Sequence, residues 1–519
     1  MKKSGLTFQY LKNDFPAGLV VFLVALPLCL GIALASGAPL FAGIITGIVG
    51  GIVVGALNKS ELSVSGPAAG LTVIVLTAIT TLGSYQAFLF SVVIAGVLQM
   101  VFGFAKAGII GNFFPSSVIR GMLAAIGLIM ILGQLPVFLG VDTTGLKDEG
   151  LNFFGALTGG ETDVLLNNMN MAALAIGVIS LLIMIGWEKA SFTKRGVLRL
   201  VPAPLVAVMF AILGHLLVSR MLPALAMGGS YLVNIPGLGG GELRSAFLLP
   251  DFSQWNNPQI YTTAITIAVI ASLETLLSVD AVDKMDPMKR ESPRNQVLKT
   301  QGIGNLICGL IGGLPMTAVI VRSSTNVAAG GKTRMASVIH GAFLVLAVLA
   351  LSSLLNLIPL SALSAVLLIV GYKLTKPALY KMQFKLGRAQ FVPFIVTVGA
   401  ILVTDLLVGI MTGIAVSVYF VLKNNYKLSH SLKQEDDQEQ KVVNIHLSEH
   451  VSFLNKPVLL NTLERVPPQS RVIIDGSRSR YIDHDALEII HDFKRKASER
   501  SILLELNKVP HFELSNNAH

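Results

Sequence analysis

The chain has 519 residues, of which 53% are hydrophobic and only 13% charged, and its net charge is +10. Soluble globular proteins carry about 25% charged residues, so this composition excludes a protein that lies wholly in water. The charges are also unevenly spread, because residues 431–519 hold 12 basic and 14 acidic side chains. The positive charge therefore belongs to residues 1–430. There the basic residues form short groups between apolar runs, a pattern that does not indicate a nucleic-acid-binding surface.

Fourteen apolar runs follow one another in residues 1–430, and two of them are short. A transmembrane helix needs about 20 mostly apolar residues to cross a bilayer. The first run is too long for the core of a signal peptide and is expected to be a retained span. The predicted spans are residues 15–35, 38–57, 67–82, 86–105, 117–139, 170–187, 200–219, 260–280, 297–313, 315–329, 335–355, 359–373, 388–407 and 408–424.

The connections between these runs predict the orientation of the chain. Lys and Arg concentrate on the cytoplasmic side of membrane proteins. With the N-terminus inside, 22 basic residues fall in inner segments, whereas the outer segments hold only Lys147, Arg220 and Arg244. A miscount by one span would destroy this alternation of inner segments rich in basic residues with outer segments that have few. The sequence therefore predicts an even number of spans, with both termini in the cytoplasm.

A helix-breaking proline precedes each short run. The segments are Ser65-Gly66-Pro67-Ala68-Ala69-Gly70 before the third run and Gly312-Gly313-Leu314-Pro315-Met316-Thr317-Ala318 before the tenth. Non-helical backbone at membrane depth requires a protein-lined or watery cavity, and helix N-termini attract anions. The third and tenth runs are equivalent in two halves of seven, so the second half enters the membrane inverted, as in secondary transporters. The alternative is that each proline only kinks a helix.

Ionisable side chains inside membrane spans are costly and usually functional. Glu274 lies in the middle of the eighth span, with Ser278 one turn further along, and is the candidate partner of a cation or proton. Arg322 lies about two turns into the tenth span, where it would supply positive charge beside an anion. Its alternative is a structural ion pair, with Glu274 as one candidate partner. Asp405 is expected to be solvated or to cap a helix.

Other patterns do not indicate an enzyme. Cys29 and Cys308 both fall in apolar runs, so neither a disulfide framework nor a zinc site is expected, and both cysteines are interpreted as small buried hydrophobic residues. Gly330-Gly331-Lys332-Thr333 resembles a phosphate-binding loop but lacks the earlier glycine, and it is interpreted as an inner turn. The apolar part shows no catalytic or metal-ligand arrangement. No cofactor is predicted beyond Na⁺ or H⁺ as a coupling ion.

Several of these segments together resemble the sulfate permease family of anion transporters, in order along essentially the whole chain. They are Asp14-Phe15-Pro16-Ala17-Gly18 at the first span, Val64 to Ala69 before the third, Ser272-Leu273-Glu274 in the eighth, Gln301-Gly302-Ile303-Gly304-Asn305, Arg322 to Asn326, and Ala329 to Thr333. The resemblance implies an all-helical membrane domain (residues 1–430) built as a seven-plus-seven inverted repeat, the architecture that nucleobase permeases also have. Spans 1–4 and 8–11 would form a core domain, and spans 5–7 and 12–14 a gate domain. A homodimer is also implied.

The resemblance also implies the site residues. The anion would lie between the third and tenth helix ends, near Ala68, Ala69, Gly70, Ala318, Val319, Ile320, Arg322, Pro27 and Leu28. Glu274 matches an acidic position linked to sodium or protons in cation-coupled bacterial members, with Ser278 as a further ligand. The sequence departs from the family pattern at Leu28, which follows Pro27 where Gln is common, and at the apolar Val319 and Val321.

The polar tail predicts a small α/β domain at residues 441–519, joined by an acidic linker at residues 431–440. Strands are expected at 442–447, 471–475 and 501–506, and a helix at 485–497. This order resembles a STAS domain, a cytoplasmic module that is a candidate for binding a cytosolic protein. His484 follows Ile482-Asp483 where the related anti-sigma-factor antagonists carry a phosphorylated serine, so that switch is not expected.

The sequence thus predicts secondary active transport of a small inorganic anion across the cytoplasmic membrane, coupled to Na⁺ or H⁺, by movement of the core against the gate. Bicarbonate and sulfate are favoured, and the apolar lining of the tenth span favours bicarbonate slightly. The alternatives are a nucleobase permease of the same architecture, a membrane-embedded sensor that signals through the STAS domain, and an anion channel. The tail and Arg322 argue against the first, and the buried carboxylate of Glu274 argues against the last.

Overall fold

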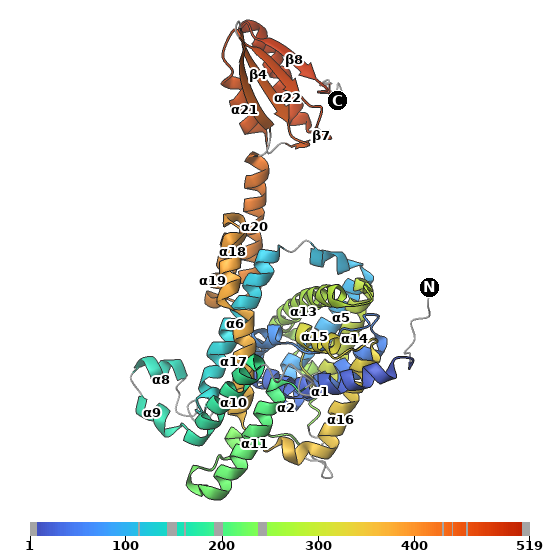
Figure 1. Cartoon of the computed structure of the whole chain (residues 1–519), viewed down its shortest axis with the longest axis vertical. Helices are drawn as coiled ribbons and strands as arrows, with labels where there is room; N and C mark the ends of the chain where they lie inside the picture. Colours follow the sequence, from blue (N-terminus) through green and yellow to red (C-terminus); the bar gives the residue numbers. More distant parts are fainter. Residues whose placement is uncertain are drawn as a thin grey trace. The chain divides into compact units, whose positions relative to one another are not determined.

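The structure is a computed structural model of the whole chain (Figure 1). It describes residues 8–112, 115–142, 153–159, 162–190, 201–236, 246–427, 430–437, 440–452 and 455–510. Several basic residues that were used to predict orientation lie outside the described residues, namely Lys2, Lys3, Lys147, Lys194, Arg195, Arg199 and Arg244.

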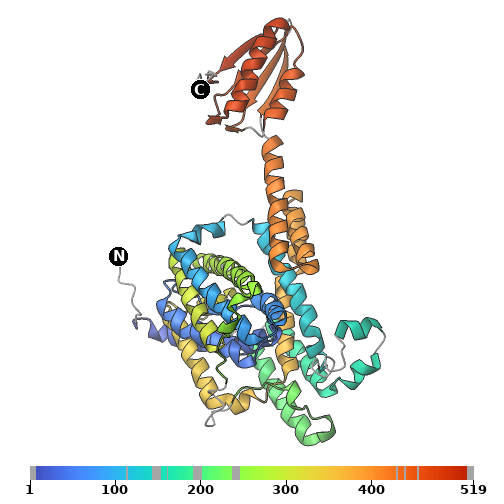
Figure 2. The ribbon, with the colours of Figure 1, turned by 180° about the vertical axis from the view of Figure 1, so that it is seen from behind.

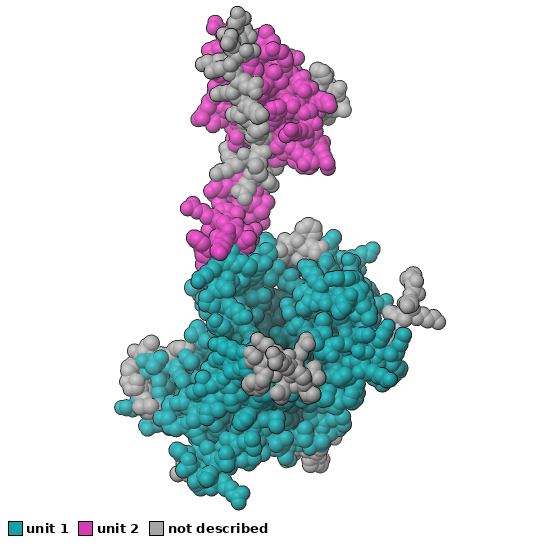
Figure 3. All heavy atoms as spheres, in the orientation of Figure 1, with its two compact units in different colours: residues 1–382, 397–410 teal, residues 383–396, 411–519 magenta. Residues whose placement is uncertain are grey.

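The chain divides into two compact units, which are described separately (Figure 3). Unit 1 comprises Met1–Met382 and Thr397–Ile410, and unit 2 comprises Gln383–Val396 and Met411–His519. The boundary between these units falls within the last membrane helices, and the predicted end of the membrane domain at residue 430 stays a prediction. Unit 2 contains the polar tail together with parts of these helices.

Long helices make up most of the first 427 residues (Figures 1 and 2). The α-helices are α1 (Leu11–Ala35), α2 (Leu40–Val49), α3 (Gly55–Leu57), α4 (Thr72–Leu82), α5 (Tyr85–Phe104), α6 (Ser116–Phe138), α8 (Phe153–Gly159), α9 (Thr162–Asn167), α10 (Met171–Lys189), α11 (Ala203–Met221), α13 (Pro258–Met285), α14 (Arg294–Ile311), α15 (Ile320–Ala328), α16 (Met335–Leu355), α17 (Leu360–Leu374), α18 (Pro377–Lys385), α19 (Arg388–Val403) and α20 (Leu406–Lys427). Shorter 3₁₀ or π segments are η1 (Gly50–Val54), η2 (Ala69–Leu71), η3 (Ala107–Asn112), η6 (Pro223–Leu225), η7 (Gly229–Tyr231) and η8 (Phe252–Asn256).

A helix forms within each of the fourteen predicted apolar runs. Among the described residues, ten helical segments are long and apolar enough to cross a membrane, and the apolar helices at Ala69–Leu82 and Arg388–Val403 are shorter. The chain is therefore a helical, multi-pass membrane protein. The exact count of fourteen spans stays a prediction, because α14 carries many polar residues and α15 has only nine residues.

The two interrupted helices meet through a short pair of strands. Strand β1 (Ser65–Pro67) precedes η2 and α4, and β2 (Met316–Ala318) precedes α15. The strands are antiparallel, with Ser65 opposite Ala318 and Pro67 opposite Met316. The sequence predicted non-helical backbone at both places, and this is confirmed. The pairing of the two segments was not predicted, and it brings the N-terminal ends of α4 and α15 together.

Glycines let other helices approach these strands. Helix α2 continues into the π-helical segment η1 at Gly50, where a Cβ atom would lie 2.5 Å from the carbonyl oxygen of Ser65. Helices α5 and α14 run side by side (Figures 1 and 2). A Cβ at Gly96 would come within 2.4 Å of the Leu306 nitrogen. These close contacts require glycine at both positions, because the methyl group of an alanine would force the backbones apart.

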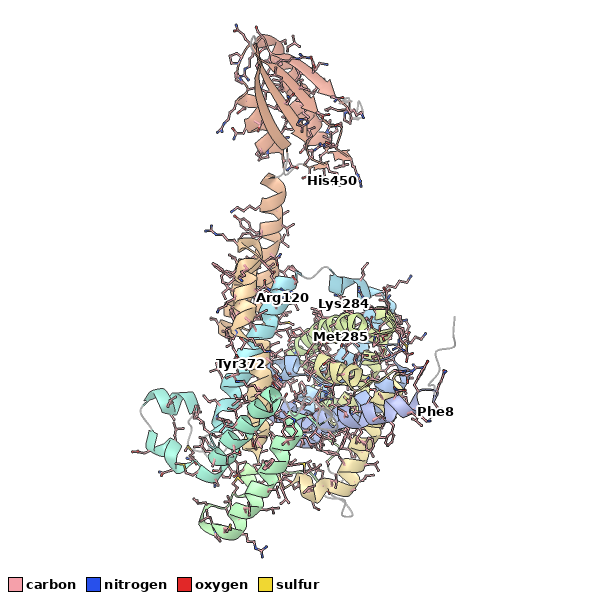
Figure 4. All side chains as sticks on the ribbon, viewed as in Figure 1. Phe8, Arg120, Lys284, Met285, Tyr372 and His450 are labelled. Carbon is pink, nitrogen blue, oxygen red and sulfur yellow. The ribbon has the colours of Figure 1, made fainter. Side chains whose placement is uncertain are left out.

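Other helices of unit 1 form a second packed group. Helix α6 lies against α17, and α10 lies against α11 and α17. Figure 4 marks Arg120 on α6 and Tyr372 on α17, and it marks Lys284 and Met285 at the C-terminal end of α13. The groups correspond to the predicted gate and core spans, but this division stays a prediction.

Unit 2 contains a small α/β fold. Its four-stranded sheet has the order β3-β4-β6-β8, formed by β3 (His430–Asp437), β4 (Gln440–Leu447), β6 (Arg471–Asp475) and β8 (Leu503–Asn507). The other elements are β5 (His450–Val451), β7 (Tyr481–Ile482), α21 (Lys456–Glu464) and α22 (His484–Glu499). The core strands β4, β6 and β8 are parallel, as the predicted alternation of strands and helix requires.

The acidic segment 431–440 was expected to be a linker, but most of it forms strand β3, which pairs antiparallel with β4. Its polar side chains gave no hydrophobic alternation, so the strand signal was missing. Helix α22 begins one residue earlier than predicted, since Asp483 is its N-cap and accepts a hydrogen bond from the Asp485 backbone. His484 is exposed at the first position of this helix.

Candidate functional site

The N-terminal end of α15 holds free backbone donors, of which Ile320 was predicted and Val321 was not. The Ala318 amide donates to the Thr275 hydroxyl at 3.3 Å, and the Val319 amide donates to the Val64 carbonyl at 3.0 Å. The amides of two of the three residues predicted here are therefore used within the fold. Among the described residues, the amides of Ile320 and Val321 have no such partner. Both residues are exposed, by 42% and 46%, so this helix end is accessible.

The N-terminal end of α4 faces an acidic side chain. Glu274 on α13 places its carboxylate against the backbone of Gly70, where a Cβ atom would lie 2.6 Å from Oε2. This oxygen has no hydrogen-bond partner among the described residues. Ala69, the neighbouring residue, is half-buried, and Ala68 is buried. The carboxylate therefore occupies the end of the helix that carries partial positive charge.

Arg322 on α15 is fully buried. Its Nη2 donates to the thiol sulfur of Cys29 at 3.4 Å, whereas Nε and Nη1 have no partner among the described residues. The guanidinium packs on Gly66, and His340 on α16 is close enough for an electrostatic interaction. The described residues provide no carboxylate ion pair for Arg322, so the structural pair with Glu274 that the sequence left open is absent.

Two other arginines of unit 1 differ from Arg322 in having acidic partners. Arg290 pairs with Asp286 at 2.7 Å, and Arg294 pairs with Asp280 at 2.6 Å. Asp280 lies in the last turns of α13, and Asp286 directly follows that helix. Arg322 differs from both in being fully buried without a carboxylate partner among the described residues.

A shell of buried polar side chains fixes the two strands. Asn305 accepts from the Met316 amide at 2.6 Å and donates to the Met316 carbonyl at 3.2 Å. Thr46 bonds the backbone of Leu314 in the same two ways. Gln301 donates to the Ser65 hydroxyl at 2.6 Å. Because lipid offers no partners to exposed peptide groups, these contacts allow strands to exist at this depth.

The first span contributes differently from the prediction. Pro27 and Leu28 are buried within α1. Leu28 packs in an apolar cluster with Ala203 and Val366, from α11 and α17. The next residue, Cys29, contacts Arg322 instead. Cys29 is therefore buried, as expected, but is more than a small hydrophobic residue.

Sequence reasoning also missed His340, whose two ring nitrogens are buried without a partner among the described residues. The available signal was an imidazole within an otherwise apolar span. Ser278, one turn beyond Glu274, is buried as well. In the described part of the chain no three His, Cys, Asp or Glu side chains are grouped as a metal site. A sodium ion at Glu274 therefore stays a prediction.

The STAS-like part of unit 2 has a polar cluster of its own. At the carboxyl ends of the parallel strands, Asp475 contacts His446 at 3.1 Å and accepts hydrogen bonds from Ser477 and Asn507. The hydrogen bonds from the Ser477 backbone and hydroxyl, together with His446, hold the pKa of Asp475 below its ordinary value. The histidine thus has a carboxylate partner, which the sequence did not identify.

A helical, multi-pass bundle in which two broken helices start from a shared strand pair defines a class of membrane transport proteins. Residues 11–397 match the model of the sulfate permease family. The chain belongs to this family, whose members are transporters and not enzymes.

Relatives span most of the chain. A putative sulfate transporter of Bacillus subtilis, YvdB, is 27% identical over 432 residues, which cover 83% of this chain and 77% of the relative. The bicarbonate transporter BicA of a Picosynechococcus species is 25% identical over 523 residues, covering 97% and 84% of the two chains.

Solved structures show the same fold. The transmembrane domain of a cyanobacterial bicarbonate transporter BicA matches with a TM-score of 0.63 and 23% identity, covering 79% of this chain and 99% of that one. The murine anion transporter Slc26a9 in an inward-facing state matches with a TM-score of 0.74 and 17% identity, covering 97% and 86%. The second match covers nearly the whole of this chain, whereas the interpretation of the tail as a STAS domain stays a prediction.

Proposed function

We propose that this chain carries bicarbonate, or a similarly small inorganic anion such as sulfate, across the cytoplasmic membrane by secondary active transport. The observation that carries the proposal is the fully buried Arg322 guanidinium without a carboxylate partner among the described residues. A buried, unpaired charge is strongly destabilising. An anion bound at the start of α15 offsets this charge and accepts hydrogen bonds from the amides of Ile320 and Val321.

The choice of anion rests on the donors that remain free. The hydroxyls of Ser323 and Thr72 already donate to backbone carbonyls, whereas the Thr275 hydroxyl accepts from the Ala318 amide. The site therefore relies on amides and charge and has few hydroxyl donors for a tetrahedral oxyanion. This favours bicarbonate over sulfate. The relatives fit either substrate, because BicA is named a bicarbonate transporter and YvdB a putative sulfate transporter.

Coupling is assigned to Glu274. A negatively charged carboxylate at the end of α4 repels an anion that enters between α4 and α15. A proton or a sodium ion at Glu274, with Ser278 as a further ligand, removes this repulsion, so binding of the cation and binding of the anion favour each other. The anion site includes Ala68, Ala69 and Gly70 as its second wall.

The remaining expectations form part of the same proposal. The core spans move against the gate spans, the protein works as a homodimer, and both termini face the cytoplasm. The STAS domain then lies in the cytoplasm, where it is available to a protein partner. These features are consistent with the shared fold.

The test is uptake of labelled bicarbonate into proteoliposomes that contain the full chain. Uptake is measured with and without an inward sodium gradient or proton gradient, and with excess unlabelled sulfate. Gradient-dependent uptake that sulfate fails to inhibit is the expected result. Absence of bicarbonate uptake under every gradient would contradict the choice of bicarbonate, and absence of labelled sulfate uptake as well would contradict the proposal.

A charge variant makes the test specific to the site. Arg322→Gln keeps a polar, hydrogen-bonding side chain, shorter than that of Arg322, and removes the charge, so it is expected to abolish saturable uptake. Arg294→Gln is the matched control, because Arg294 is partly exposed and already has Asp280 as its partner. Equal losses in the two variants would contradict the role of Arg322.

A further inference from the structure

The first turn of α1 carries a carboxylate with an unusual set of partners. Asp14 is fully buried. Its Oδ1 accepts from the backbone amides of Lys332 and Thr333, at 2.7 and 3.0 Å, and its Oδ2 accepts from the Thr333 hydroxyl. The partners lie more than 300 residues away in the sequence. Asp14 therefore ties the start of α1 to the turn between α15 and α16.

This turn is the Gly330-Gly331-Lys332-Thr333 segment that resembles a phosphate-binding loop. Gly330 has a φ of +87°, which glycine adopts without strain. A Cβ at Gly331 would lie 2.0 Å from Oδ1 of Asn326. Successive amides in such a turn form a concave site for an anion. Here that site is filled by the chain's own carboxylate, which explains the resemblance without a nucleotide.

The turn is also held from two other directions. The Lys332 carbonyl accepts a hydrogen bond from Arg290 at 2.8 Å, and Arg290 lies in the connection that follows α13. Arg334 donates to the Asn58 carbonyl at 2.6 Å, and its amide points to Glu61 at 3.3 Å. Among the described residues, Asp14 supplies the hydrogen bonds between α1 and the turn, and the Lys332 ammonium also lies over the ring of Tyr10, the N-cap of α1.

This connection matters because both helices take part in the proposed anion site around the Arg322 guanidinium. Cys29 of α1 accepts the hydrogen bond from Arg322, and α15 carries Arg322 together with the free amides. The turn begins at the C-terminal end of α15. A change in the position of the turn relative to α1 therefore shifts α15, with its free amides and Arg322, against Cys29 on α1.

We propose that Asp14 is a positioning residue, which sets the placement of α15 against α1 and through it the affinity for the transported anion, without touching the anion. This inference rests on the proposed function for its transport readout. A second readout, described below, does not depend on transport.

The transport test compares Asp14→Asn, Asp14→Glu, Thr333→Val and Glu61→Gln in proteoliposomes. In Asp14→Asn a side-chain NH₂ group replaces one carboxylate oxygen, so it faces a hydrogen-bond donor of the turn and cannot accept from it. KM for bicarbonate is therefore expected to rise about tenfold, with a maximal rate within twofold of wild type. Thr333→Val keeps both amide donors and should raise KM about threefold. Asp14→Glu should recover part of the affinity. Glu61→Gln, which changes the same turn away from α1, should leave KM unchanged.

The second readout uses the thiol of Cys29 in a Cys308→Ala background. Cys29 is buried against Arg322, so a maleimide should modify it slowly in wild type and at least fivefold faster in Asp14→Asn, whereas Glu61→Gln should match wild type. A merely structural role would lower the melting temperature and the maximal rate of all variants without changing KM or this ratio of rates.

The proposal is overturned if Asp14→Asn has the KM and the thiol reactivity of wild type, or if Glu61→Gln changes both as much as Asp14→Asn does. If the wild-type protein transports neither bicarbonate nor sulfate, the proposed function fails, and the thiol reactivity alone decides the positioning role.

Discussion

The two broken helices begin in the same way and face opposite charges. Helices α4 and α15 each follow one strand of the β1–β2 pair, so their N-terminal ends lie close together. Each end carries the partial positive charge of its helix dipole. At α4, the Glu274 carboxylate offsets this charge, whereas at α15 the Arg322 guanidinium adds to it. A repeated backbone arrangement therefore yields two different chemistries. One end suits a proton or cation, and the other suits an anion.

The first prediction removes the space for the carboxylate at α4. In Gly70→Ala the new Cβ would overlap Glu274 Oε2, since the two atoms would be 2.6 Å apart. We expect gradient-driven uptake to fall about 100-fold, because a misplacement near 1 Å has effects of that order. Gly399→Ala is the control, as a Cβ there meets no atom within 4 Å. Uptake by Gly70→Ala within twofold of wild type would refute the contact.

The second prediction concerns the strands that create both ends. Asn305→Leu leaves the amide and the carbonyl of Met316 without partners, which should lower the free energy of unfolding by about 2 kcal/mol. Gln301→Leu removes only a bond to the Ser65 hydroxyl and should cost less. Thermal unfolding in detergent, followed for both variants, checks the order. The reverse order would show that β1 and not β2 depends on side-chain support.

The third prediction makes the two ends more alike. His340→Asp places a carboxylate near Arg322 and supplies the missing counterion, so the apparent affinity for bicarbonate should fall about tenfold. His340→Asn changes size and hydrogen bonding without adding charge and should retain most of the affinity. The measurement is KM from initial uptake rates. Equal effects of Asp and Asn would show that packing, and not charge, makes His340 important.

The smallest expected effect is at the partner of Arg322 on α1. Cys29→Ser replaces the sulfur, which lies 3.4 Å from Nη2, with a smaller oxygen. The guanidinium should shift slightly toward α1, and KM for bicarbonate should change by about threefold or less. Cys308→Ser, which changes a buried cysteine outside this contact, is the control. A loss greater than tenfold for Cys29→Ser alone would mean that the thiol has a larger role than orienting Arg322.

The interruptions before α4 and α15 could be predicted from the sequence, but the contact between the two interrupted segments could not. Pro67 and Pro315 marked both interruptions, and Glu274 and Arg322 were recognisable as ionisable groups inside apolar runs. A three-residue strand has no periodicity, so the pairing of β1 with β2 could not be predicted. The contact of Glu274 with Gly70 joins residues about 200 positions apart and follows from that pairing. The use of the Ala318 and Val319 amides by the scaffold was hidden for the same reason.

The polar tail gives a similar contrast on a smaller scale. The apolar strand β6 was predicted with its observed bounds, because a short buried strand reads as an apolar run. The neighbouring strand β3 was missed, since its acidic sequence resembles a solvated linker. Its position follows from the register with β4, which only the folded chain defines.

The most direct test of the contrast between the two helix ends is a comparison of exchange with gradient-driven uptake in Glu274→Gln. Both assays use labelled bicarbonate and the same proteoliposomes, and Glu291→Gln, which changes an exposed acidic residue, is the control. If Glu274 is the coupling group and α15 binds the anion, the variant exchanges internal for external bicarbonate but no longer accumulates it in response to a sodium or proton gradient. A variant that still accumulates bicarbonate in response to the same cation as wild type would contradict this account.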